Sequence, residues 1–226
     1  MESIKVWDLP TRLFHWSLLL LMICLWWSGD AGEMDWHQIF AYTLLSLILF
    51  RILWGFCGSE TSRFSHFICS PIIVIQYFKR TIKSGIKPHQ GHNPLGGYMI
   101  LGLLFSLIIQ LATGLFATDD VLAEGPLYSL VSYDTALIIT TIHRYNFDLL
   151  LILIGIHVLA VMIHMMMGDK LLQPMFSGKR RIDKKQSIQK ILKPVQFAPN
   201  WQALIIFLLI FGCIGYFLIW PILAYL

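Results

Sequence analysis

Long apolar runs separated by short polar segments dominate this chain. We predict membrane-spanning helices at residues 12–28, 37–56, 94–116, 144–167 and 201–226. Each run is close to the roughly 20 residues that a helix needs to cross the hydrocarbon core of a bilayer. Asn93 and Pro94 supply an N-cap and a first-turn residue for the third run. The pattern therefore predicts an all-α integral membrane bundle, with four core helices and a fifth, C-terminal transmembrane helix.

The segments between these runs complete the expected organisation. The apolar stretch at 67–78 is too short to span a bilayer and contains Pro71, so we expect an interfacial amphipathic helix there. The first run lacks a small-residue cleavage pattern, so we expect the first helix to be retained. The chain then divides into a transmembrane domain at 1–178, a basic cytoplasmic linker at 179–200 and the C-terminal helix at 201–226.

Composition and charge agree with a membrane protein and orient it. Hydrophobic residues make up 57% of the 226 residues, charged residues 13%, and the mean hydropathy is +0.68. If the N-terminus, the loop after the second run and the tail after the fourth share one side, that side holds 15 of the 17 basic residues. The positive-inside rule then puts the N-terminus in the cytoplasm and the C-terminus outside. The basic charge reflects topology and anionic lipid, so no nucleic-acid partner is expected.

Four histidines in the apolar runs are the candidate metal ligands. His143 and His157 are fourteen residues apart, which puts them on one face of a helix and about 21 Å apart along its axis. His37 is expected at the depth of His143, and His15 at the depth of His157. Two pairs at two depths could hold two stacked haems with bis-histidine ligation. The alternative for each is a hydrogen bond to a neighbouring helix or a solvated position at the interface.

Other polar residues are weaker candidates for binding a cofactor. Arg51 is expected near the inner histidine pair, as a partner for a haem propionate or as a snorkelling lipid anchor. Arg12 and Arg144 adjoin the histidine-bearing segments and could play similar parts, or serve topology alone. Four polar residues near the cytoplasmic ends of the runs are candidates for a quinone pocket: Arg12, His92, Asn93 and His164. The alternative place for quinone is the outer loops, which contain Asp119, Asp120 and Tyr133. The four cysteines form no C-x-x-C motif, so covalent haem, thiolate zinc and iron–sulfur sites lack support.

Several motifs resemble a known family. They are VWDLPTRLFHW near the N-terminus, WHQIFAYTLLSLILFRILWGFCGS, GHNPLGG and IHRYNFDLLLILIGIHVLAVMIH. Together they are similar to the bacterial b-type cytochromes grouped with the Ni/Fe-hydrogenase cytochrome b subunit, over most of residues 4–178. The resemblance implies a bundle of four or five helices with two non-covalent b haems, whose ligands would be His15, His37, His143 and His157. One departure is the very short loop after the first run, which makes 117–142 the likelier docking surface.

These observations predict a di-haem cytochrome b that relays electrons across the bacterial inner (plasma) membrane. Quinone would react near the inner haem, and a c-type cytochrome or another redox subunit would exchange electrons with the outer one. Whether the chain is an enzyme with quinone oxidoreductase activity is left open, as is a homodimer. Two alternatives also remain: a proton or solute transporter with a histidine relay and no haem, and a membrane anchor for a soluble enzyme.

Overall fold

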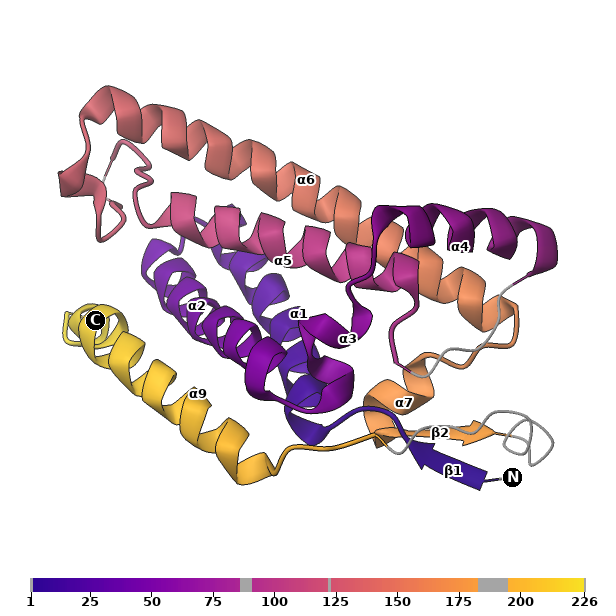
Figure 1. The fold of residues 1–226 in the computed structure, drawn as a ribbon. Helices are drawn as coiled ribbons and strands as arrows, with labels where there is room; N and C mark the ends of the chain where they lie inside the picture. Colours follow the sequence, from indigo (N-terminus) through magenta and orange to yellow (C-terminus); the bar gives the residue numbers. More distant parts are fainter. Residues whose placement is uncertain (1, 86–90, 122, 183–194, 226) are drawn as a thin grey trace. The chain divides into compact units, whose positions relative to one another are not determined.

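The computed structural model describes residues 2–85, 91–121, 123–182 and 195–225 (Figure 1). Two compact units make up the chain. The first unit consists of Met1–His15, Arg51–Ile100 and Ile156–Ala203, and the second of Trp16–Phe50, Leu101–Gly155 and Leu204–Leu226. Helices predominate in both, as the apolar periodicity predicts.

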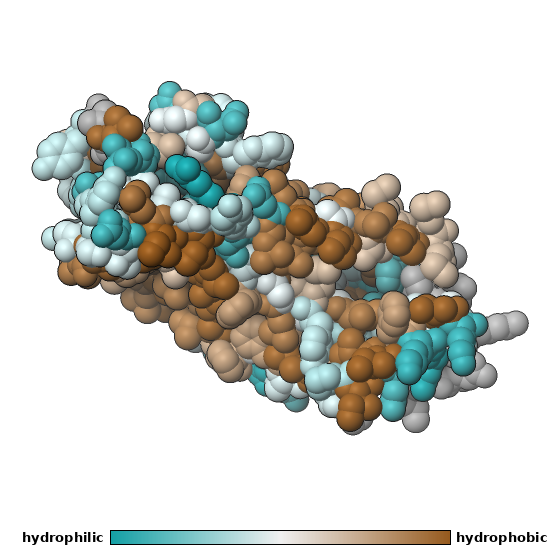
Figure 2. Space-filling model, turned by 90° about the horizontal axis from the view of Figure 1, so that it is seen from above, coloured by the Kyte–Doolittle hydropathy of each residue, from teal (hydrophilic) through white to brown (hydrophobic). Residues whose placement is uncertain are grey.

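Among the described residues, five helices are long and apolar enough to cross a membrane. They are α1 (Leu9–Asp30), α2 (Met34–Cys57), α5 (Pro94–Gly114), α6 (Tyr133–Met166) and a final run made of α9 (Asn200–Ile214), the π-helical η3 (Gly215–Ile219) and α10 (Trp220–Leu223). Hydrophobic side chains, brown in Figure 2, cover most of the face shown there. The chain is thus a multi-pass membrane protein, and the five predicted spans are confirmed as helices.

Helix α6 is longer than the sequence pattern suggests. It begins at Tyr133, whereas Arg144 was the expected start of the fourth run. The hydroxyl of Ser132 accepts a hydrogen bond from the backbone N–H of Thr135 at 3.3 Å, which caps the helix at this earlier point. His143 therefore lies well inside a helix rather than at its end. At 1.5 Å per residue, the 34 residues of α6 extend about 51 Å, more than the roughly 30 Å of a bilayer core.

Polar side chains cap two other spans. The carboxylate of Asp8 accepts a hydrogen bond from the Thr11 N–H at 2.9 Å and so caps α1. Asn93 accepts one from the Gly96 N–H at 2.7 Å through its side-chain oxygen, as its position before Pro94 predicts. Both caps satisfy backbone donors that a helix start leaves free.

Shorter elements of the first unit complete the fold. Strand β1 (Glu2–Lys5) pairs antiparallel with β2 (Lys179–Ile182), and Figure 1 shows them as neighbouring arrows. Helix α7 (Leu172–Ser177) precedes β2. The start of the predicted basic linker is therefore a strand, and residues 183–194 of that linker lie outside the described residues. The strands were not expected from the sequence.

The loop after α2 contains three short helices. They are η1 (Glu60–Ser62), α3 (Phe64–Phe67) and α4 (Pro71–Ser84). In α4, Ile75, Phe78 and Ile82 are exposed on one side, which agrees with the amphipathic helix predicted for this region. The helix begins four residues later than expected because Ser70 caps it, accepting the Ile72 N–H at 3.3 Å.

Each unit has buried side chains of its own. In the second unit, Ile39 and Tyr42 of α2 form a cluster with Ile214 and Ile219 of the final helix. The fifth helix therefore belongs to the packed bundle. In the first unit, Trp54 is completely buried together with Asp8 and with Thr61 and Ser62 of η1. A further 3₁₀ helix, η2 (Tyr128–Leu130), lies in the loop before α6.

Candidate cofactor sites

Each predicted histidine pair lies within one of the two units. His15 on α1 and His157 on α6 belong to the first unit, where their side chains lie within electrostatic range of each other. His37 on α2 and His143 on α6 belong to the second unit and interact in the same way. All four side chains are half-buried. Helix α6 thus contributes one histidine to each pair.

His37 has the hydrogen bonds of an imidazole prepared for a metal. Its Nδ1 lies 3.0 Å from the carbonyl oxygen of Leu25 and 3.2 Å from the hydroxyl of Ser28. A carbonyl oxygen only accepts, so Nδ1 carries the proton and Nε2 keeps its lone pair. Metal-binding histidines in proteins commonly donate their second N–H in this way, which fixes both the tautomer and the ring orientation.

His143 is held by a polar network that connects α5 to α6. Its Nδ1 lies 2.9 Å from the carbonyl oxygen of Gln110 and 3.0 Å from the hydroxyl of Thr113, while its Nε2 lies 3.0 Å from the Gln110 amide nitrogen. The amide oxygen of Gln110 accepts a hydrogen bond from Asn146 at 2.7 Å, and Ser106 bonds Asn146 in turn. This network fixes the same Nδ1–H tautomer as in His37. Binding of iron at Nε2 would require the Gln110 amide to move aside.

A glycine lies against each histidine of the outer pair. A Cβ atom on Gly29 would approach the His37 ring to 3.3 Å, and a Cβ atom on Gly114 would approach Cε1 of His143 to 3.1 Å. Both distances are shorter than ordinary van der Waals contacts. The two rings therefore occupy positions that only a residue without a side chain leaves open, which fits a pair of oriented metal ligands.

Arg51 is the main polar feature beside the inner pair. Arg51 is 3% exposed, and its Nη1 has no hydrogen-bond partner among the described residues. The guanidinium lies 5.2 Å from the centre of the Phe64 ring and interacts electrostatically with Asp8. A buried guanidinium with an open donor is suited to an anionic group such as a haem propionate. The residues around both pairs thus fit b-type haem.

Asp8 is a functional residue that the sequence reasoning did not single out. Its carboxylate is completely buried and accepts hydrogen bonds from the Trp54 indole at 3.0 Å and the Ser62 hydroxyl at 3.4 Å, besides capping α1. It is therefore the anion that partly balances Arg51. No local signal connects Asp8, before the first run, to Arg51 in the second run.

His92 stands close to the inner pair without belonging to it. Its ring packs against Trp7 at 4.4 Å and against Phe67 at 5.1 Å between centroids. Burial, reinforced by the positive charge of Arg51, lowers the pKa of His92 to about 3. The imidazole is therefore neutral at physiological pH and can donate or accept a hydrogen bond.

The remaining candidates have different surroundings. Arg12 donates hydrogen bonds to the carbonyl oxygens of Phe176 and Asp8, and Asn93 uses its side-chain oxygen to cap α5. Nδ1 of His164 lies 3.3 Å from the carboxylate of Asp169, which also pairs with Arg180. Arg144 is exposed on α6. Of the predicted quinone-pocket residues, His92 is thus the one that the structure brings near the inner pair.

Other metal chemistry finds no support in the described part of the chain. No group of three or more His, Cys, Asp or Glu side chains there is arranged to hold a metal ion. The four cysteines are free. Haem iron needs only two axial histidines from the protein, so the pairs above remain the candidate centres.

Comparison with known proteins gives a family match. A family model described as prokaryotic cytochrome b561 matches residues 6–178, which covers more than half of the chain and includes all four histidines. No curated protein and no solved structure gives a significant match.

Proposed function

The chain belongs to the prokaryotic cytochrome b561 family, and on that premise we propose that each of its two histidine pairs binds one b-type haem. Membership makes it a membrane b-type cytochrome of electron transfer. Bound haem would supply one-electron redox chemistry. The observation that carries the proposal of two haems is the division of the pairs between the two units, with α6 contributing to both.

At the inner centre, His15 and His157 would be the axial ligands. Arg51 would donate to a propionate through its open Nη1, and Asp8 would limit the cost of keeping that cation buried. A positive charge near iron favours the reduced form, so the balance between Arg51 and Asp8 would tune the potential. Arg51 is only 3% exposed, which argues against the alternative that its side chain snorkels to the lipid headgroups.

At the outer centre, His37 and His143 would be the ligands. Both present a protonated Nδ1 to a backbone carbonyl, of Leu25 and Gln110 respectively, and this orients Nε2. Arg144 is exposed near His143 and would suit a propionate or the aqueous interface equally.

We further propose that quinone reacts beside the inner centre and that a redox protein docks on the outer side. His92 would hydrogen-bond the quinone head group, because it is neutral and lies within electrostatic range of His15 and His157. The outer loop before α6 contains Asp119, Asp120 and Glu124, which would attract a positively charged partner such as a c-type cytochrome or a hydrogenase-like subunit.

We also propose in which membrane the chain lies and which of its segments face the cytoplasm. The basic N-terminal segment and the basic segments after α2 and α6 would face the cytoplasm of a bacterial cell, with the C-terminus in the periplasm. Lipid contacts the exposed apolar faces of the spans.

The haem content of the purified protein tests the proposal. We expect two haems per chain by the pyridine haemochrome method, each with a low-spin spectrum. His157→Ala should lose one haem and keep the other. His164→Ala is the matched control, since it removes a histidine one heptad further along α6 that pairs with Asp169. One haem per chain in the wild type, or a haem lost from the control, would contradict the assignment. A protein without a Soret band would support the haem-free transporter.

A further inference from the structure

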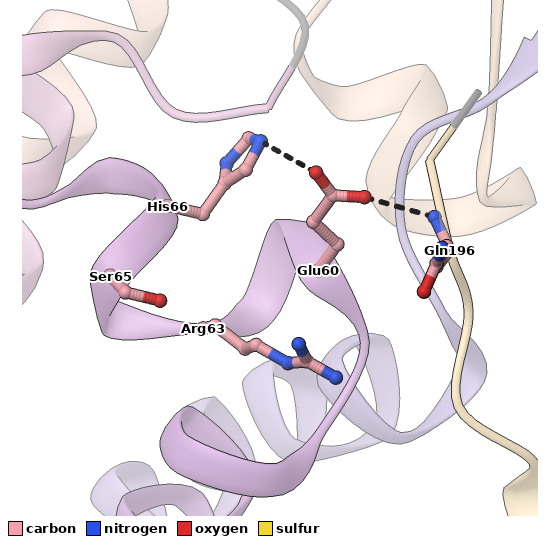
Figure 3. Close-up of a pocket in the computed structure, with 5 residues that line it drawn as sticks. All are labelled: Glu60, Arg63, Ser65, His66 and Gln196. Atoms are coloured by element: carbon pink, nitrogen blue, oxygen red, sulfur yellow. Dashed lines mark hydrogen bonds and ion pairs between the residues drawn. The ribbon is translucent and has the colours of Figure 1, made fainter. Parts of the chain in front are cut away.

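A polar pocket of about 410 Å³ opens in the first unit. Five side chains line it, and all are polar or charged: Glu60, Arg63, Ser65, His66 and Gln196. In Figure 3 the carboxylate of Glu60 lies between His66 and Gln196. One of its oxygens is 3.9 Å from His66 Nε2, and the other accepts the Gln196 N–H at 3.0 Å. Such a lining suits water and protons better than an apolar quinone ring.

Glu60 and His66 face each other in the pocket, and Arg63 lines the pocket beside them. Arg63 donates its Nε–H to the carbonyl oxygen of Gly58 at 2.7 Å. The side chains of Glu60 and His66 are 39% and 31% exposed, so both reach solvent. An imidazole can accept a proton at one ring nitrogen and release one from the other, so His66 is chemically suited to proton transfer.

The inner wall of the pocket adjoins His92. Cε1 of His66 lies 4.0 Å from the position of a Cβ atom on Gly91, the residue before His92, and His66 interacts electrostatically with His92 itself. Thr61 contacts the same glycine position at 3.9 Å. Its hydroxyl is buried and has no hydrogen-bond partner among the described residues. A hydroxyl can both donate and accept a hydrogen bond, so Thr61 can connect groups in the pocket to groups in the interior.

We propose that this pocket is the proton port of the inner centre, in which His66, paired with Glu60, carries protons between the quinone head group at His92 and solvent. The inference rests on the proposed quinone reaction. Oxidation of a quinol there would release two electrons, which bound haem would accept one at a time, and two protons. For each proton the O–H bond of the quinol breaks and an N–H bond forms on His66, which then releases the proton to water in the pocket.

The charges around His66 support this direction of transfer. The charged and titratable groups facing it are Glu60 and Arg63 from its own segment and His92 from the loop before α5. One carboxylate oxygen of Glu60 lies 3.9 Å from Nε2 of His66. His92, with a pKa near 3, does not hold the proton as a cation and acts through hydrogen bonding. Gln196 is neutral and positions the carboxylate through its backbone.

Stopped-flow reduction of the haem-loaded protein by a quinol analogue tests the port. His66→Gln should slow haem reduction by at least about tenfold, within the range of general acid–base catalysis, and added imidazole should restore part of the rate. Glu60→Gln should have a smaller effect. Gln76→Ala is the control, since it changes an exposed polar residue of α4 that does not line the pocket, and it should leave the rate unchanged. Reduction by dithionite, which involves no quinol protons, should be equal in all variants.

A second measurement does not depend on activity. Diethyl pyrocarbonate should modify His66 of the haem-free chain at least several times faster than His92, as mapped by mass spectrometry. Protection of His66 would mean that the port is closed and would overturn the proposal.

The outcomes separate the two proposals. One outcome is that quinol reduces the wild type while His66→Gln reacts at the wild-type rate from about pH 6 to 9. That result would overturn the proposed proton port and leave the proposed quinone site in place. If quinol does not reduce the wild type at all, the proposed quinone reaction fails and the port fails with it.

Discussion

Replacing Gly114 by alanine should loosen the outer haem by displacing one of its proposed ligands. The new Cβ atom would lie 3.1 Å from Cε1 and 3.5 Å from Nδ1 of His143, so the ring must move by a few tenths of an ångström. That shift acts directly on the 2.9 Å hydrogen bond from Nδ1 to the Gln110 carbonyl. Holding a side chain off its preferred rotamer costs about 0.5–1.5 kcal/mol. Haem affinity at this centre should therefore fall roughly two- to twelvefold.

A second glycine of the same helix supplies the control. A Cβ atom on Gly102 would have nothing within 4 Å, so Gly102→Ala introduces no contact. Alanine inside a helix is favoured over glycine by about 0.5–1 kcal/mol, so this variant should be at least as stable as the wild type. Transfer of haem to an excess of apomyoglobin, followed optically, measures the loss from each variant. The reasoning would be refuted if Gly114→Ala released haem no faster than Gly102→Ala.

Three further predictions concern topology, the buried carboxylate and pH. A reporter fused after Leu226 should be active only if it functions outside the cytoplasm, and cytoplasmic activity would contradict the orientation. Asp8→Ala removes a cap and leaves the Trp54 N–H buried without an acceptor, so thermal unfolding in detergent should show a loss of about 2–4 kcal/mol; Asp8→Asn, which keeps the cap, should lose less, and equal losses would count against the role of the cap. Because the pKa of His92 is lowered from 6.5 to about 3, the unfolded chain binds more protons between these values, and stability should fall as the pH drops through this range. His92→Gln should flatten that part of the profile, and an unchanged slope would speak against it.

The spans were accessible to prediction because each depends on a local pattern. A bilayer demands about 20 apolar residues per helix, and few other structures satisfy that demand. Asn93 followed by Pro94 is a cap that sequence alone identifies, and the structure confirms it. The spacing of His143 and His157 puts them on one face of α6, and each lies in the unit of its predicted partner.

Features that depend on distant partners escaped the sequence reasoning. Strand β1 pairs with a segment at the other end of the family domain, and no local signal joins Glu2–Lys5 to Lys179–Ile182. Arg12 reaches the carbonyl oxygen of Phe176, 164 positions away. Helix α6 begins at Tyr133, before the expected start at 144, because a charged residue such as Arg144 does not end a helix.

Gln110 and Asn146 were also missed, although both carried a usable signal. Each is an uncharged polar residue inside an apolar run, where an amide needs a partner because lipid offers none. The two amides satisfy each other through a hydrogen bond at 2.7 Å, and Gln110 also hydrogen-bonds His143. Polar residues within spans thus identify the neighbours of a ligand as well as the ligand.

Polar groups inside the spans separate into those that the protein satisfies and those that it leaves open. The hydroxyl of Ser46 donates to the carbonyl oxygen of Tyr42 at 3.0 Å, and that of Thr43 donates to Ile39 at 2.8 Å, so both are satisfied within α2. Arg51, on the same helix, keeps a buried donor with no hydrogen bond among the described residues. His37 uses Nδ1 in its hydrogen bonds and leaves Nε2 outside them. An unsatisfied polar group costs several kcal/mol in a bilayer, so the two proposed haems would account for these residues, with a propionate of the inner haem satisfying Arg51 and the iron of the outer haem satisfying His37.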